Sequence, residues 1–252
     1  MKLNLKDRVA FVTGGGAGIG EAIARVLAAE GCRVVVADRA QNAATLAAAA
    51  MTRDGLTAHA VTLDVAEASA VEAAFAALRD KFGAPEILVN AAGVLSTGRF
   101  ADSPAGEFQR VARVNIDGII NCVQAAIPAM TAARHGRIVN IASVSAMRGG
   151  GSVGNTLYGA SKAAVAALTM GLARELGPSG ITVNAVAPAI LDTAMTHAAL
   201  TEEARKRILP RIPLGRLATT ADVADLVAFL VSERAGFITG AVIPVDGGIL
   251  TT

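Results

Sequence analysis

Short runs of Val, Ile and Ala alternate with longer segments of helical pattern along most of this 252-residue chain. Apolar runs with few interspersed polar residues indicate parallel strands buried on both faces, and the helices between them supply the crossovers. We expect strands at about residues 8–13, 32–38, 57–63, 86–90, 137–142, 181–186 and 241–245. The predicted fold class is α/β: a doubly wound parallel sheet of the Rossmann type, with about seven strands and helices on both faces.

The segments between these strands carry the helical pattern, at about residues 18–30, 41–54, 67–82, 107–133, 158–176 and 220–233. No Pro-, Gly- or Ser-rich linker and no charged linker interrupts this alternation. A chain of this length fits one large α/β domain or two small ones. We therefore expect residues 1–252 to form a single domain.

Composition argues against several classes of function. The net charge of +2 is small and evenly spread, so nucleic-acid binding is not expected. Cys32 and Cys122 lie in apolar patterns, which predicts core positions in a protein from a reducing compartment. His59, His135 and His197 have no metal-ligand spacing, so no metal site is predicted. No apolar run reaches the roughly 18 residues of a membrane span, and the first residues lack a signal-peptide pattern. The expected location is the cytoplasm, without a membrane partner.

A glycine-rich loop at residues 13–20 follows the first predicted strand and leads into the first helix. Glycines there allow a tight turn and let backbone N–H groups approach a pyrophosphate, which the positive end of the helix dipole also favours. This placement between strand and helix predicts a dinucleotide site. We expect Gly14, Gly18 and Ile19 to contact the cofactor.

Asp38 ends the second predicted strand, 18 residues after Gly20, where an acidic residue hydrogen-bonds the adenosine ribose. Its carboxylate would oppose a 2′-phosphate, because two unit charges about 4 Å apart repel by roughly 4 kcal/mol at an effective dielectric of about 20. The predicted cofactor is therefore NAD(H) rather than NADP(H). Arg39 is the counter-argument, since it could turn towards a 2′-phosphate instead of serving as surface charge.

Tyr158 is the only tyrosine of the chain, and Lys162 follows it four positions later. On a helix this spacing puts both side chains on one face. A free tyrosine has a pKa of about 10, and a nearby ammonium can lower that value by roughly 1–3 units. The pair therefore predicts a hydroxyl that passes a proton to or from an alcohol oxygen.

With these features together, the chain resembles the classical short-chain dehydrogenase/reductase family over about residues 5–250. The family's motifs occur in its order, at residues 13–20, 63–65, 90–93, 114–115, 140–143 and 246–248. The resemblance implies that the Asp64 side chain and the Val65 backbone hold the adenine ring. It also implies that Asn90 belongs to the cofactor site, although Ala91 replaces the second asparagine of the family's Asn-Asn-Ala-Gly element.

The same resemblance assigns catalytic roles. Tyr158 would be the general acid/base, and Ser143 would hydrogen-bond the substrate oxygen. Lys162 would depress the pKa of Tyr158 and hold the nicotinamide ribose. Asn115 would fix a helix distortion and a proton-relay water.

Two departures from the family pattern concern the neighbourhood of the nicotinamide. Ala189 replaces the usual glycine after Pro188, and its methyl group is expected to narrow the pocket. The backbone of Leu191 and the hydroxyl of Thr193 still match the carboxamide-binding positions. The interval from Ser143 to Tyr158 is 15 residues, two more than is usual, and the run at residues 148–152 could absorb the excess. Ser145 has the usual spacing to the tyrosine, but Ser143 follows the strand motif directly and is favoured.

Residues 194–211 would cover the substrate as a lid. The first part of this segment is mostly apolar, which suggests a small hydrophobic or mixed carbonyl or alcohol substrate. Residues 202–207 are expected to form a solvated charged helix face rather than an anion site. Arg134 and Arg137 could meet an acidic carrier protein, although surface charge is the favoured interpretation.

The resemblance thus implies an NAD(H)-dependent enzyme that interconverts a secondary alcohol and a ketone by hydride transfer. An activity like that of the 3-oxoacyl-carrier-protein reductases is the alternative within the family. A catalytically silent nicotinamide-binding or scaffold protein is the alternative from another class, and the retained Ser143, Tyr158, Lys162 and Asn115 argue against it. The family also implies a homotetramer.

Overall fold

The structure is a computed structural model that describes residues 2–151 and 153–251; Ser152, one end of the loop predicted to absorb two extra residues, lies outside the described residues. Within these residues one parallel sheet contains seven strands, β1 (Val9–Thr13), β2 (Arg33–Asp38), β3 (Ala58–Thr62), β4 (Ile87–Asn90), β5 (Gly136–Ile141), β6 (Ile181–Pro188) and β7 (Val242–Val245). Their spatial order is β3-β2-β1-β4-β5-β6-β7, and every neighbouring pair is parallel. The predicted fold class is confirmed.

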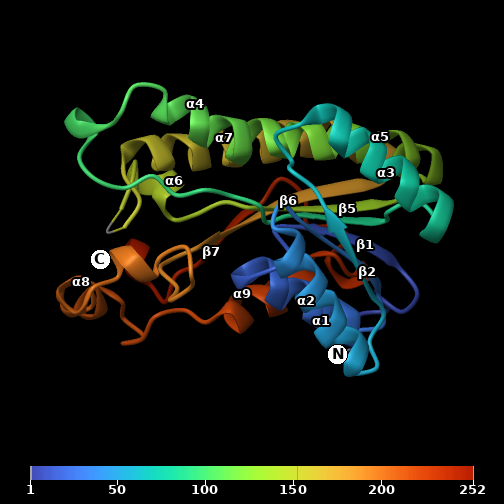
Figure 1. Cartoon of the computed structure of the whole chain (residues 1–252), viewed down its shortest axis with the longest axis horizontal. Helices are drawn as coiled ribbons and strands as arrows, with labels where there is room; N and C mark the ends of the chain where they lie inside the picture. Colours follow the sequence, from blue (N-terminus) through green and yellow to red (C-terminus); the bar gives the residue numbers. More distant parts are fainter. Residues whose placement is uncertain (1, 152, 252) are drawn as a thin grey trace.

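Helices cover both faces of the sheet. In the described part of the chain they are α1 (Gly18–Ala29), α2 (Gln41–Arg53), α3 (Ala68–Phe82), α4 (Glu107–Ala112), α5 (Gly118–Ala133), α6 (Ser145–Arg148), α7 (Thr156–Leu176), α8 (Glu202–Ile208) and α9 (Thr220–Leu230). Figure 1 shows α3, α4, α5 and α7 on one side of the sheet and α1, α2 and α9 on the other. A β3-to-β4 connection carries the chain back past β1 and β2, so the strand order reverses between β1 and β4. That reversal is where an open α/β sheet presents its ligand site.

Each face of the sheet has its own apolar core. Val12, Val36 and Val139 point into the core shared with α1, α2 and α9, whereas Phe11 and Val35 point into the core shared with α3, α5 and α7. Successive residues of one strand therefore serve opposite faces, which is why these strands carry continuous apolar runs. The two cysteines are core residues as expected, because both Cys32 and Cys122 are 0% exposed.

The helical stretch Glu107–Ala133 is long and apolar enough, by length and composition alone, to cross a membrane. The core helix of a soluble protein can have the same length and apolar composition. Its buried face contains Ile119, Val123, Ala126 and Met130, which pack in the core shared with α3 and α7. The stretch is also interrupted by a π-helical turn, Arg113–Asp117, between α4 and α5. The turn contains Asn115, one of the predicted site residues.

The segment predicted as a lid folds as a short 3₁₀ turn (His197–Ala199), α8 and a second 3₁₀ turn (Leu209–Arg211). Its Leu200, Ala204 and Ile208 form a small apolar cluster with Ile212 and Ile249. Figure 1 shows α8 near the C-terminus, beyond the carboxyl ends of the central strands. The segment therefore lies over the edge of the sheet where the loops gather.

Candidate active site

A cavity of about 240 Å³, here called the inner cavity, lies at the carboxyl ends of β1, β4, β5 and β6. Its walls come from the glycine loop, the residues that follow β4, the end of β5, the first turns of α7 and the segment after β6. Among the predicted site residues, those that line it are Gly14, Gly18, Ile19, Asp38, Ser143, Tyr158, Lys162, Leu191 and Thr193. The fold thus brings together residues spread over most of the sequence.

The glycine loop fits a dinucleotide phosphate because it leaves no room for side chains. Gly14 has φ +63°, and a Cβ there would stand 2.8 Å from the Cα of Ala92. A Cβ on Gly20 would stand 2.1 Å from the carbonyl oxygen of Gly14. Ala17, which precedes α1, makes no side-chain cap hydrogen bond, so the first N–H groups of this helix can serve an anion.

Asp38 is held at the end of β2 by two backbone amides. Its carboxylate accepts hydrogen bonds from Gly16 N at 3.1 Å and from Ala40 N at 3.0 Å. Beside it is a small pocket of about 90 Å³, the edge pocket, which Asp38 shares with Asp64 and Val65. Arg39 lines the same pocket, so the carboxylate and the guanidinium both face the position expected for the adenosine ribose.

Ser143 and Tyr158 face one another where the inner cavity meets a second, outer cavity. Ser143 follows β5 by two residues and Tyr158 lies in the first turn of α7, and both residues line both cavities. A hydrogen bond from the Ser143 hydroxyl acts to lower the pKa of Tyr158. Lys162 lies one turn further along α7, is 4% exposed and donates from Nζ to the carbonyl oxygen of Ile141 at 2.7 Å.

The electrostatics of this pair differ from the sequence-based expectation. Burial raises the pKa of Tyr158 to about 12, and the Ser143 hydrogen bond offsets only part of that effect. The ammonium of Lys162, 5.8 Å from the centre of the tyrosine ring, does not reverse it. Burial also lowers the pKa of Lys162 itself to about 8. In the protein without cofactor the phenol is therefore firmly protonated at neutral pH.

Ser145 occupies a different position from Ser143. Its backbone amide donates to the Ser143 hydroxyl at 3.1 Å, and Ser145 begins α6, the short helix that leads away from the strand. Ser145 lines the outer cavity but not the inner one. The hydrogen bond to Tyr158 belongs to Ser143, which agrees with the choice made from the strand motif.

Asn115 lies behind the inner cavity, in the π-helical turn. Its side chain is 0% exposed, accepts from Val94 N at 2.8 Å and donates to Val94 O and to the Ser161 hydroxyl, both at 3.0 Å. A Cβ on Gly93 would stand 3.3 Å from Asn115 Oδ1 and 3.7 Å from Lys162 Nζ. Asn115 therefore ties the loop after β4 to α7, and π-helical turns of this kind are frequent at functional sites.

Asn90 is the predicted cofactor residue that the structure places away from the cavities. It ends β4, is 2% exposed and donates from Nδ2 to Asn140 Oδ1 at 2.9 Å. Asn140 in turn donates to the Thr169 hydroxyl on α7. Asn90 therefore links β4, β5 and α7 beneath the site and lines none of the pockets described here.

The segment after β6 closes the inner cavity. Thr193 donates its backbone N–H to the Thr196 hydroxyl at 3.1 Å, and the two threonine hydroxyls lie 3.2 Å apart. Ala189, which replaces the family's glycine, lines both the inner and the outer cavity. Ala189 therefore lies at the boundary between them.

Sequence reasoning missed residues that hold this site in place. Asn155 caps α7: its side chain accepts from the backbone N–H of Tyr158 at 3.1 Å and donates to the Ser96 hydroxyl at 2.9 Å. An asparagine just before a helical segment is an N-cap signal that could have been used. Thr13 accepts from the backbone N–H groups of Ala91 and Ala92 and so fixes the loop after β4.

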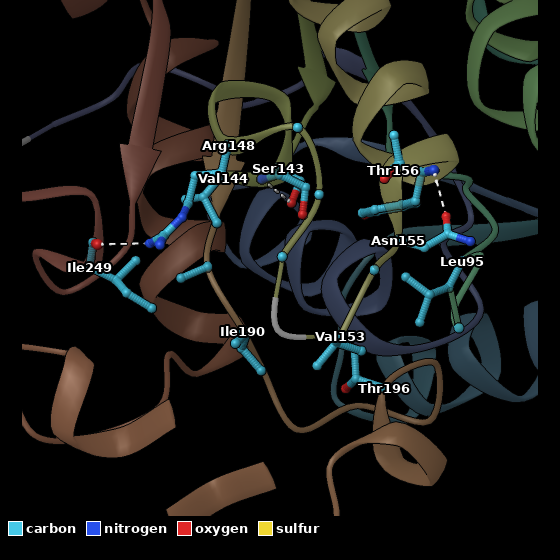
Figure 2. Close-up of a pocket in the computed structure, with 18 of the residues that line it drawn as sticks. Leu95, Ser143, Val144, Arg148, Val153, Asn155, Thr156, Ile190, Thr196 and Ile249 are labelled. Atoms are coloured by element: carbon cyan, nitrogen blue, oxygen red, sulfur yellow. Dashed lines mark hydrogen bonds between the residues drawn. The ribbon is translucent and has the colours of Figure 1, made fainter. Parts of the chain in front are cut away.

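The outer cavity has a volume of about 770 Å³ and opens in front of Ser143 and Tyr158. Figure 2 shows Arg148 on one side of it, reaching the backbone carbonyl of Ile249, with Asn155 and Thr156 on the opposite side. Arg207 of α8 also lines this cavity. The helix expected within residues 202–207 is present, but its charged side chains are not all directed away from the site.

Comparisons with known proteins agree with this geometry. Residues 14–250 match the family profile described as enoyl-(acyl carrier protein) reductase. The chain is 40% identical over 246 residues to a meso-2,3-butanediol dehydrogenase of Serratia marcescens, covering 98% of this chain and 96% of that protein. It is 38% identical over 247 residues to a 3-oxoacyl-[acyl-carrier-protein] reductase of Pseudomonas aeruginosa, covering 98% and 99%.

A crystal structure from Beutenbergia cavernae, provisionally assigned as an NAD(P)-dependent gluconate 5-dehydrogenase and holding NADP at low occupancy, superposes with a TM-score of 0.94. It is 35% identical in sequence, and the match covers 100% of both chains. The glycine loop and the edge pocket beside Asp38 fit a nicotinamide dinucleotide, and Ser143, Tyr158 and Lys162 gather beside them. The chain belongs to the short-chain dehydrogenase/reductase family of nicotinamide-dependent oxidoreductases.

Proposed function

We propose that this protein is an NAD(H)-preferring oxidoreductase that interconverts a secondary alcohol and a ketone, with Tyr158 as general acid/base. The observation that carries the proposal is the pair of hydroxyls, Ser143 and Tyr158, hydrogen-bonded at the junction of the inner and outer cavities. A carbonyl oxygen bound there would meet both hydroxyls while its carbon faced the inner cavity.

In this proposal the nicotinamide supplies or accepts a hydride when bound in the inner cavity. Ser143 hydrogen-bonds the substrate oxygen and orients it towards Tyr158. Tyr158, whose pKa burial raises, is protonated at neutral pH and donates its proton as negative charge develops on that oxygen. Asn115 acts as a positioning residue, because its hydrogen bonds hold the Val94 backbone and Ser161 rather than the reacting atoms.

Lys162 completes the proposed proton path. Its amine lies near Gly93, where a Cβ would stand 3.7 Å from Nζ, and it would hold the nicotinamide ribose of a bound cofactor. With the cofactor bound, the ammonium form would favour the phenolate and lower the pKa of Tyr158 from its value in the free protein. The proposed cofactor contacts also include Asp64, Val65, Leu191 and Thr193.

The preference for NAD(H) rests on Asp38. Two backbone N–H groups fix its carboxylate beside the edge pocket, so a 2′-phosphate placed there would meet a negative charge that cannot easily move away. Arg39 lines the same pocket and opposes this argument. The similar structure from Beutenbergia cavernae holds NADP at low occupancy, so the carboxylate of Asp38 is the feature of this chain that favours NAD(H).

The alternative within the family is a 3-oxoacyl-carrier-protein reductase activity, as named for the Pseudomonas aeruginosa relative. Arg134 and Arg137 gave this alternative its support in the sequence. Arg137 is 8% exposed and bonds backbone carbonyls at the amino end of β5, the opposite end from Ser143, and Arg134 donates to Pro178 O. Neither arginine lies where a carrier protein would enter the active site, so a small substrate is favoured.

We also propose that residues 1–252 act as one domain with residues 194–211 as its lid, and that the protein is a cytoplasmic homotetramer. Exposed apolar side chains on the helical layer support association there: Phe108 on α4 is 41% exposed and Met170 on α7 is 52% exposed. At the other edge, β7 is a terminal strand, with Phe237 fully exposed before it. Light scattering coupled to size exclusion would give the number of subunits.

Initial-rate kinetics test the proposed function. A panel of ketones and secondary alcohols is assayed with NADH, NADPH and their oxidised forms, and kcat/KM is compared for each pair. Turnover with a clear preference for NADH supports the proposal. Turnover only with NADPH would overturn the cofactor assignment, and cofactor binding without turnover of any substrate would favour the catalytically silent alternative.

A further inference from the structure

The outer cavity is lined by charge of one sign. Among the described residues that line it, the charged ones are Arg99, Arg148, Arg207 and Arg211. They come from three separate parts of the chain: the turn before residue 100, the end of α6, and α8 with the 3₁₀ turn that follows it. Asp and Glu are absent from the described lining. A cavity walled by one sign of charge concentrates ligands of the opposite sign.

Arg148 and Arg207 differ from ordinary paired surface charge, whereas Arg99 lies 3.8 Å from the carboxylate of Asp102. Arg205 is paired with Asp192 and lies 3.7 Å from Glu202, so carboxylates neutralise it. The side chain of Arg207, two positions later, forms no ion pair or hydrogen bond with the described residues 2–151 and 153–251. Arg148 donates one N–H to the carbonyl oxygen of Ile249 at 3.1 Å, which fixes the side chain without neutralising it.

The arginines and the reacting groups lie at different parts of one cavity. Ser143 and Tyr158 are at its junction with the inner cavity, while Arg148 is the last residue of α6 and points to the C-terminal segment (Figure 2). Arg207 and Arg211 are four residues apart, so they project from one side of α8 and its extension. The apolar side chains of Ile190 and Val153 line the same cavity.

We propose that the substrate is an anionic ketone or alcohol, in which a carboxylate or phosphate lies against Arg148 and Arg207 while the reacting carbon lies at Ser143 and Tyr158. This inference rests on the proposed function and defines its substrate class. A planar guanidinium donates paired N–H bonds to carboxylate and phosphate alike, so the shared requirement is an oxoanion. The Arg-Gly-Gly-Gly loop lies in the Ser143-to-Tyr158 interval, which is two residues longer than usual; it carries Arg148 and is part of this specificity.

The test compares ketones with and without a negatively charged group. The first pair is 4-oxopentanoate and its methyl ester, and the second is dihydroxyacetone phosphate and dihydroxyacetone. The kcat/KM of each is measured with NADH and with NADPH, for wild type, Arg207→Gln, Arg148→Gln and Lys206→Gln. Lys206 neighbours Arg207 on α8, carries the same charge and does not line the outer cavity, so it is the matched control.

We expect the wild type to prefer the anion of at least one pair, and the pair that is favoured distinguishes carboxylate from phosphate. Arg207→Gln and Arg148→Gln should each lower the anion-to-neutral ratio by about tenfold, the size of one charged hydrogen bond. Lys206→Gln should leave that ratio unchanged. A wild type that reduces the neutral member of both pairs as well as the anion, or a ratio that neither arginine variant alters, would overturn the inference but leave the proposed function intact.

Binding gives a second measurement that does not need turnover. The melting temperature of each protein, already saturated with NADH, is recorded with and without 4-oxopentanoate or its methyl ester. The inference predicts a rise for the acid that both arginine variants lose and Lys206→Gln keeps. If no ketone is reduced with either cofactor, the proposed function fails, and this thermal comparison still decides whether the cavity binds anions.

Discussion

At the scale of single residues, the strand motif favours Ser143 as the catalytic serine, whereas the usual spacing to the tyrosine favours Ser145. Both are buried, and the second donates its backbone amide to the first. Only Ser143 reaches Tyr158, so Ser143→Ala should lower kcat/KM by about 10²-fold or more, as for the loss of another positioned donor at a developing oxyanion. Ser145→Ala should change kcat/KM little. The reverse order of losses, with unchanged melting temperatures, would contradict the assignment.

Tyr158→Phe removes the proposed acid/base and leaves the ring in place. We expect kcat to fall by about 10²–10⁴-fold, the usual contribution of a general acid. The dissociation constant for NADH, measured by fluorescence titration, should stay close to that of the wild type. Lys162→Ala should impair both quantities, because its amine lies where the ribose is expected. Near-native turnover by Tyr158→Phe would show that another group supplies the proton.

Asp38→Asn isolates the charge that is proposed to select NAD(H). The amide keeps an oxygen for one of the two backbone N–H groups but carries no negative charge against a 2′-phosphate. The ratio of kcat/KM for NADH to that for NADPH should fall by about tenfold or more, because the repulsion at stake is a few kcal/mol. Arg39→Gln is the control and should move the ratio in the opposite direction. A ratio that Asp38→Asn leaves unchanged would shift the selection to other residues of the edge pocket.

Residues that the fold brings together around the inner cavity could be predicted from the sequence, because their positions depend on local motifs. Ser143 follows a strand, Tyr158 and Lys162 are one helical turn apart, and the glycine loop joins a strand to a helix. Side-chain direction and burial were harder to predict. The Asn90 side chain bonds to Asn140 and lines none of the cavities, whereas Arg207 lines the outer cavity. Neither result follows from the spacing of residues in the sequence, because each depends on packing against a distant segment.

At the scale of elements, α7 depends on its N-cap. Asn155 accepts from Tyr158 N and donates to Ser96 and to Thr97 O, so it anchors the catalytic turn to the loop after β4. Asn155→Ala should lower the free energy of unfolding by about 1–2 kcal/mol, measured by urea titration, and should also lower kcat. Asn155→Asp keeps the cap acceptor but lacks the amide donors. If Asn155→Asp keeps the stability of the wild type but has a lower kcat, the hydrogen bonds to Ser96 and Thr97 position Tyr158. If the wild type and both variants are equally stable, the Asn155 cap does not stabilise α7.

The elements themselves were largely predictable. The seven expected strands and the long helices occur, and their observed bounds differ from the predicted ones by a few residues at most. Buried parallel strands and amphipathic helices are predictable because each has a characteristic pattern of apolar residues in the sequence. The short α6 was missed, since four residues carry no period. The π-helical turn at Asn115 was expected only through the family resemblance, because a local change in hydrogen bonding leaves no apolar pattern.

At the scale of the whole molecule, two apolar cores hold a site that is largely polar and partly charged. The cores fix the sheet from both faces, and the reversal of strand order between β1 and β4 leaves the inner cavity at the carboxyl edge. A rigid sheet can support an amine in nearly complete burial, as for Lys162. Because this amine is buried, the free energy of unfolding should depend on pH, and the direction follows from the pKa of Lys162.

Burial lowers the pKa of Lys162 to about 8 in the folded protein, from 10.5. Between these values the unfolded chain keeps a proton that the folded chain has released, so this group makes the free energy of unfolding rise with pH. Below about pH 8 the amine is charged in both states, and its contribution no longer changes. Tyr158 acts in the opposite direction only above pH 10, because burial raises its pKa from 10.0 to about 12.

We therefore expect the stability of the cofactor-free wild type to rise, relative to Lys162→Met, as the pH increases from 8 to 10. Each pKa unit is worth about 1.4 kcal/mol, so the change in the difference between the two proteins is on the order of 2–3 kcal/mol. Urea unfolding at pH 7, 8, 9 and 10 measures it, and Tyr158 is present in both proteins. Lys206→Met, on an exposed turn of α8, should show no such trend. A difference for Lys162→Met that is constant over this range would mean that the Ile141 carbonyl keeps the buried amine protonated.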